Sequence, residues 1–369
     1  MKLVGSTCGS KAPLRKKLQL FRRPLLPFAT KVYGVLPAAT AFIAIYSKMA
    51  SVLEKKALFY ATCLPFFVFF ALYDTLIYPN AGKIEPSVSL VQSYIGGANE
   101  GGSAIVANII SHWTSALFYV VAEVYASVSI GVLFWQFAND VVSISQAKRF
   151  YPLFAQMSGL APIFAGQYVV QYASQAADFK SSMHRLMVLI VASGVAICIL
   201  YQAATNYFET SLGEATTATE EVKPKKKKKP KMSLAESAKF LASSQYLRLI
   251  SVLVIGYGLS INFTEIMWKS LVKKKYPDAL DYQRFMGNFS SILGFSTCVV
   301  IFLGVQVIRI LGWRAGALAT PGAMAILAIP FFACVLLGLD NPTNLNVAVM
   351  LGTIQSLLSK TGKYAMFGE

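Results

Sequence analysis

Long apolar runs recur along this chain and constrain its fold more than any other feature. Hydrophobic residues make up 55% of the 369 positions and charged ones 14%, whereas soluble domains carry roughly one quarter charged residues. A helix needs about 20 mostly apolar residues to cross the roughly 30 Å of hydrocarbon in a bilayer. We therefore predict an all-α, multi-pass integral membrane protein with about nine transmembrane helices. The predicted spans are about 33–47, 57–78, 114–137, 153–173, 186–206, 247–268, 287–310, 317–338 and 345–360.

The strong positive charge favours a membrane loop over a nucleic-acid surface. The net charge is +17, and much of the excess lies in the run 223–231. A nucleic-acid binder would place aromatic residues among its basic ones, but here the aromatic residues lie inside the apolar segments. Lysine and arginine concentrate in cytoplasmic loops of membrane proteins. The lipid bilayer is therefore the expected partner, and nucleic acid is not.

Basic residues also predict the orientation. Alternate loops contain Lys48 to Lys56, Lys148 and Arg149, the run 223–231, Arg314, and Lys360 with Lys363. We place this set on the cytoplasmic side or its equivalent. The opposite set is poorer in lysine and arginine, except for Lys273, Lys274 and Lys275.

Composition divides the chain into four parts. Residues 1–30 form a basic leader or targeting arm, and 207–245 form a lysine-rich segment that cannot bury a core and should stay solvated. Between and after them we predict an N-terminal transmembrane group at 31–206 and a C-terminal group at 246–369. Two helical groups joined by a long loop are typical of transporters that hold their substrate between the groups.

No pattern in the sequence predicts an enzyme or a metal site. The five cysteines lack metal-ligand spacing, and the two histidines, His112 and His184, lie far apart in sequence. Thr361, Gly362 and Lys363 have the last letters of a phosphate-binding loop but lack its first glycine. We therefore expect neither a catalytic residue nor a cofactor.

Charged residues within or beside the spans are the functional candidates. Glu123 lies near the middle of a span, where a charge costs roughly 2.5–3.5 kcal/mol on insertion scales. It should face a polar surface or partner, although a structural hydrogen bond from a neutral carboxyl is an alternative. Glu265 lies four residues before Lys269 and could form a simple helix-surface pair with it. Lys31 begins the first span and could instead be an interfacial anchor.

Several strings resemble one family, the ATP/ADP translocases of plastids and parasitic bacteria. They occur in the family's order, at residues 119–139, 147–154, 257–270, 285–290 and 358–364. The resemblance covers about residues 28–369. Relative to the family pattern, we expect this chain to lack the first helix and the last helices.

The resemblance implies a fold like that of the major facilitator superfamily, no covalent cofactor, and transport of nucleotides. Exchange of ATP for ADP or nucleotide uptake is the implied activity, in a plastid inner envelope or another intracellular membrane. Lys31, Glu123 and Glu265 match charged residues on which the family depends. Lys31 would attract phosphates, and the two acids would balance charge or accept a proton.

Two other functions remain open at this point. The missing helices would leave one side of the bundle incomplete, so transport by this length of chain is expected to be impaired, and a non-transporting subunit or scaffold is the first alternative. A proton-coupled carrier of another anion is the second. The sequence leaves the nucleotide preference and the oligomeric state open.

Overall fold

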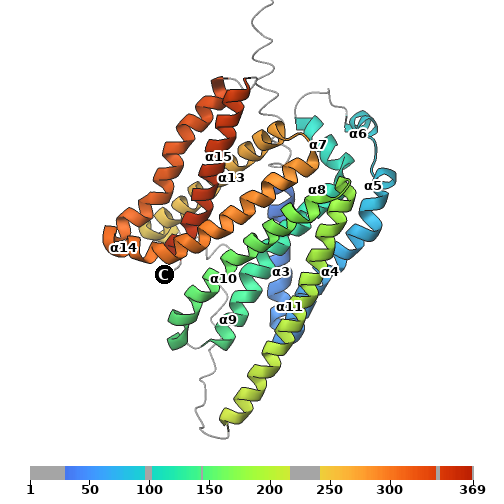
Figure 1. Ribbon diagram of the computed structural model, residues 1–369. Helices are drawn as coiled ribbons and strands as arrows, with labels where there is room; N and C mark the ends of the chain where they lie inside the picture. Colours follow the sequence, from blue (N-terminus) through green and yellow to red (C-terminus); the bar gives the residue numbers. More distant parts are fainter. Residues whose placement is uncertain (1–29, 96–101, 143, 217–241, 338–340, 368–369) are drawn as a thin grey trace, which may run out of the picture.

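The structure, a computed structural model, describes residues 30–95, 102–142, 144–216, 242–337 and 341–367, and within these ranges its elements are helices without strands. Figure 1 shows the helices as two groups that lie side by side. The N-terminal group comprises η1 (Thr30–Val35), α3 (Leu36–Val52), α4 (Lys55–Leu72), η2 (Tyr73–Ile77), α5 (Tyr78–Ile84), α6 (Val88–Ile95), α7 (Gly102–Ser111), α8 (Trp113–Val124), η3 (Tyr125–Phe134), α9 (Trp135–Val141), α10 (Ile144–Gln171), η4 (Ala173–Gln175) and α11 (Phe179–Thr216). The C-terminal group comprises α13 (Gln245–Lys275), α14 (Ala279–Leu337) and α15 (Pro342–Phe367).

Seven helices of the described chain are long and apolar enough to span a membrane. They are Tyr33–Val52, Lys55–Ile84, Trp113–Val141, Arg149–Gln175, Phe179–Phe208, Gln245–Lys275 and Ala279–Leu303. They confirm the prediction of an all-α, multi-pass membrane protein.

The last two of the nine predicted spans differ from the expectation. The eighth corresponds to a shorter apolar helix, Pro321–Leu337, within α14, and the ninth lies in α15, which is absent from the seven. The reason is that α15 contains polar residues, among them Gln355, Ser356 and Ser359, whose side chains are buried in the protein. Segment α15 is therefore helical, but less apolar than a simple span.

Asparagine and aspartate side chains mark where three helices begin. The Asp178 carboxylate accepts a hydrogen bond from the Ser181 amide at 2.7 Å, which satisfies a free donor at the start of α11. Asp278 does the same for the Leu280 and Asp281 amides of α14, and Asn341 for the Thr343 amide of α15. Within α14, Gly312 interrupts the helix with a φ of 81°, a backbone conformation that glycine adopts without strain.

The predicted lysine-rich segment is helical where it begins. Helix α11 continues to Thr216, past the expected end of its span at residue 206. Residues 217–241, with the lysine run, lie outside the described residues, as do 1–29 of the predicted leader.

Aromatic side chains fill the core of the N-terminal group. Phe66 and Phe70 of α4 pack with Val124 of α8 and Met187 of α11. A neighbouring cluster joins Phe59, Cys63, Phe67 and Leu133. These clusters fasten α4, α8, η3 and α11 together.

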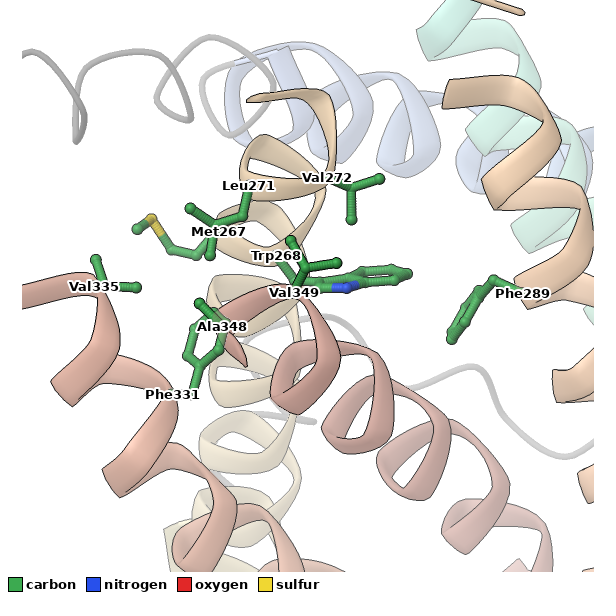
Figure 2. Packing of buried hydrophobic residues seen from close by; sticks show 9 residues of the cluster. All are labelled: Met267, Trp268, Leu271, Val272, Phe289, Phe331, Val335, Ala348 and Val349. Carbon is green, nitrogen blue, oxygen red and sulfur yellow. The ribbon is translucent and has the colours of Figure 1, made fainter. Parts of the chain in front are cut away.

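A single cluster forms the core of the C-terminal group (Figure 2). At its centre Trp268 of α13 is fully buried, with its ring 4.6 Å from that of Phe289 on α14. Figure 2 shows these two rings pointing toward each other, with Phe331 of α14 and Ala348 of α15 to their left in the view. Burial of such large aromatic side chains contributes strongly to stability. The cluster therefore fixes α13, α14 and α15 relative to one another.

The two groups meet where α10 crosses α14 (Figure 1). A Cβ atom added to Gly166 would lie 2.3 Å from the Gly287 carbonyl oxygen, and one added to Gly294 would lie 2.5 Å from that of Gly159. Ser291 donates a hydrogen bond to the Ile163 carbonyl across the contact, at 3.3 Å. Small residues at helix contacts in membranes allow such close approach of the backbones. This crossing positions the site described next.

Candidate functional site

Lys31 reaches from the N-terminal group to the C-terminal group. Its Nζ donates a hydrogen bond of 2.7 Å to Oδ1 of Asn262, near the middle of α13. Lys31 lies in the π-helical turn η1, which precedes Pro37. Proline lacks the N–H that would bond four residues back, so a wider turn at this point has a physical cause. A bond to a residue in mid-helix does not fit the alternative of an anchor at the lipid headgroups.

Glu123 lies on α8, directly beside the helix that carries Lys31. Gly34 of η1 approaches α8 so closely that an added Cβ would lie 2.9 Å from the Val120 side chain. Glu123 is one turn further along α8, and the Tyr119 hydroxyl shares a hydrogen bond with its carboxylate. The charge of Glu265 acts on Tyr119, and that of Glu123 acts on Lys269. Glu123 therefore lies within electrostatic range of the C-terminal group.

Glu265 pairs with two lysines at one carboxylate oxygen. Its Oε1 lies 2.8 Å from Nζ of Lys269 on the same helix and 2.9 Å from Nζ of Lys360 on α15. The pair with Lys269, four residues on, is the one considered as an alternative from sequence. Because Lys360 comes from another helix, the arrangement is more than a surface pair along α13.

The register between α13 and α15 is set by close packing. An added Cβ at Gly352 would lie 2.5 Å from the Trp268 indole, whose N–H donates a 3.0 Å hydrogen bond to Thr353. The Tyr257 hydroxyl donates to the Ser359 carbonyl at 2.9 Å. These contacts place Lys360, the residue after Ser359, beside Glu265.

The structure thus brings Lys31, Glu123 and Glu265 to one place between the two groups. We call the set of Lys31, Tyr119, Glu123, Asn262, Glu265, Lys269 and Lys360 the charge cluster. It holds three lysines and two glutamates. Lysines act as compact charges that attract phosphates or other anions. Such a set can bind a polyanion, with the acids tuning the net charge.

Sequence reasoning named Lys269 only as a possible pair partner of Glu265, gave no role to Tyr119 or Asn262, and misplaced Lys360. Lys360 was predicted to belong to a cytoplasmic loop, but it lies inside α15, which continues to Phe367. The error arises because a basic residue at the end of an apolar run looks the same in a loop and in a polar helix. Asn262 could have been identified as a site residue from the sequence, because it is a polar residue inside an apolar span.

Both histidines lie outside the charge cluster. His184 pairs with Asp74 at 2.6 Å, and His112 with Glu85 at 3.2 Å. Among the described residues, no group of three or more potential ligands could hold a metal ion.

Comparison with known proteins identifies the family. The profile of the TLC ATP/ADP transporter family matches residues 24–369. The chain belongs to this family. Because the family is one of transporters, its membership agrees with the prediction that the chain is not an enzyme.

Curated relatives from bacteria and plants belong to the same family. The chain is 38% identical to ADP,ATP carrier protein 1 of Chlamydia pneumoniae, over 93% of this chain and 69% of that protein. It is 35% identical to the chloroplastic ADP,ATP carrier protein 2 of Arabidopsis thaliana, over 93% of this chain and 56% of the relative. ADP,ATP carrier protein 3 of Rickettsia bellii is 32% identical, over 91% and 71%. No solved structure matches the chain.

Proposed function

We propose that this protein transports adenine nucleotides across its membrane by exchanging ATP for ADP. Its relatives are ADP,ATP carriers by name, and the family profile spans nearly the whole chain. The observation that carries the proposal is the Lys31–Asn262 bond, because it joins the two helical groups at the charge cluster. A substrate held there would contact both groups, as alternating access requires.

In this proposal the charged residues have separate roles. Lys31 binds the phosphates from the N-terminal side. Glu123 and Glu265 offset part of the positive charge of the three lysines, so that a bound nucleotide can leave again. The Tyr119 hydroxyl orients the Glu123 carboxylate through their shared hydrogen bond.

The chloroplastic relatives support placing this exchange in a plastid inner envelope or another intracellular membrane. Detection of a tagged chain with markers of these membranes would test the location.

Exchange by the purified chain in liposomes tests the function. We expect uptake of labelled ATP into liposomes loaded with ADP, and a loss of at least about tenfold in Lys31→Gln, because an ionic hydrogen bond contributes roughly 1.5–3 kcal/mol. Lys83→Gln on α5, an exposed lysine outside the cluster, is the control. An absence of uptake by the folded wild-type chain would favour the non-transporting alternative.

A further inference from the structure

The geometry around Glu265 suggests a specific way in which the substrate is bound. We propose that Lys269 and Lys360 bind the phosphate groups of the transported nucleotide, and that the Glu265 carboxylate takes the phosphates' place between substrate molecules. This inference rests on the proposed function, because it assigns the phosphate ligands of that same site.

One oxygen atom serves both lysines. Oε1 of Glu265 lies 2.8 Å from Lys269 Nζ and 2.9 Å from Lys360 Nζ. The two ammonium groups therefore converge on a single anionic oxygen. A phosphate oxygen makes the same charge-assisted contact with an ammonium group, so it can replace the carboxylate without a change of helix position.

The lysines are more accessible than the acid that joins them. The Lys269 side chain is 44% exposed and that of Lys360 28%, whereas the Glu265 side chain is 17% exposed. An anion that approaches the site therefore meets the two lysine side chains before it displaces the carboxylate between them.

The charges in this part of the cluster do not cancel. One carboxylate faces two lysines, and the other acid, Glu123, shares its hydrogen bond with Tyr119. Lys31 is bound to the neutral Asn262 side chain. The excess positive charge attracts a multiply charged anion more strongly than a neutral nucleoside.

The site rests on a rigid support. The Lys360 ammonium lies 5.9 Å from the centre of the Phe289 ring, which packs against the buried Trp268. The bonds Trp268–Thr353 and Tyr257–Ser359 already join α13 to α15. Because the helices are held together without the ion pairs, the two lysines are free to exchange their partner.

A structural role for the same ion pairs predicts a different outcome. If Glu265 and Lys360 only tie α13 to α15, neutralising either one weakens the site in the same direction. If Glu265 competes with phosphate, the two changes act in opposite directions. The sign of the effect therefore distinguishes the two roles.

The experiment measures binding to the purified full chain in lipid nanodiscs by calorimetry, with ADP, inorganic pyrophosphate and adenosine as probes. We expect Lys360→Gln to weaken ADP and pyrophosphate binding at least about tenfold, and Glu265→Gln to tighten both by roughly fivefold to tenfold, as loss or gain of an ionic hydrogen bond implies. Adenosine binding should not change, and Lys83→Gln should behave as wild type.

Three results would overturn the proposal. The first is that the Lys360→Gln variant binds ADP and pyrophosphate within twofold of the wild-type affinity, while the wild-type protein still exchanges ATP for ADP. That result would leave the proposed function intact. The second is Glu265→Gln weakening binding as Lys360→Gln does, which shows a structural role. The third is wild-type protein that neither binds ADP nor exchanges it, which removes the proposed function as well. If Lys360→Gln fails to fold, the sign of the Glu265→Gln effect decides alone.

Discussion

The two sides of the charge cluster are built differently. On the C-terminal side, Glu265 and Lys269 belong to a regular α-helix whose neighbouring Trp268 is fully buried. On the N-terminal side, Lys31 lies in the π-helical turn η1, and Glu123 lies two residues before another π-helical segment, η3. Short π-helical segments often occur at functional sites. The comparison suggests a preformed C-terminal side and an adjustable N-terminal side.

The packing of α3 also indicates an adjustable N-terminal side. Leu36 and Ile43 of α3 are largely exposed in the protein, and the helix contributes no buried residue of its own. A helix with few packed contacts changes position at low cost. We therefore expect mutations on the C-terminal side to affect stability most, and those on the N-terminal side to affect it least.

The largest effect should come from the core of the C-terminal side. Trp268→Ala removes the central side chain of the buried cluster and its hydrogen bond to Thr353, and should cost about 3–5 kcal/mol of unfolding free energy. Denaturation in mixed micelles measures the change. Trp113→Ala, at a tryptophan that is 39% exposed, is the matched control. Equal losses in the two variants would show that the C-terminal core is no more important for stability than an exposed position.

The contact between the groups should be the next most sensitive. Gly166→Ala puts a methyl group against the Gly287 backbone and should cost about 1–3 kcal/mol, because the backbone has little freedom to move away. Gly256→Ala on α13 has open space and should be neutral or stabilise by up to about 1 kcal/mol. Thermal unfolding of the two variants in the same detergent provides the test. Tolerance of alanine at residue 166 would show that the helices are further apart.

Neutralising the two acids should affect stability to different extents. Glu265→Gln leaves two lysines facing each other and should destabilise the chain by about 1–3 kcal/mol. Glu123→Gln keeps an acceptor for the Tyr119 hydroxyl, so its effect should stay under about 1 kcal/mol. Added pyrophosphate should restore the melting temperature of Glu265→Gln and leave that of Glu123→Gln unchanged. A larger loss in Glu123→Gln would reverse the assignment of the rigid side.

A small effect on stability is expected where the two sides touch. Asn262→Ala removes the partner of Lys31 and should cost about 0.5–1.5 kcal/mol, the net value of one hydrogen bond. Tyr257→Phe removes one hydrogen bond inside the C-terminal side and is the matched control for stability. In exchange assays Asn262→Ala should lower the rate more than Tyr257→Phe does, because only Asn262 positions Lys31. Equal rates would show that the bond to Lys31 has no part in the cycle.

Much of the fold was predictable because lipid imposes a simple rule. Backbone groups inside the bilayer must bond within their own segment, so long apolar runs become helices. The prediction of a membrane span was less accurate in α15, because the buried residues Gln355 and Ser359 lower the mean hydropathy of this packed helix. Hydropathy measures the average character of a segment, and it cannot distinguish polar residues that face protein from those that face water.

The class of protein, its helical elements and three charged candidates follow from the sequence, because an ionisable residue within an apolar run is costly unless it has a function. Which of these charges meet depends on the tertiary structure. Lys360 lies 95 positions from Glu265, and Asn262 lies 231 positions from Lys31. Contacts over such separations depend on how the helices pack, which here follows from Gly34 against Val120 and Gly352 against Trp268. No local pattern in the chain encodes those pairings.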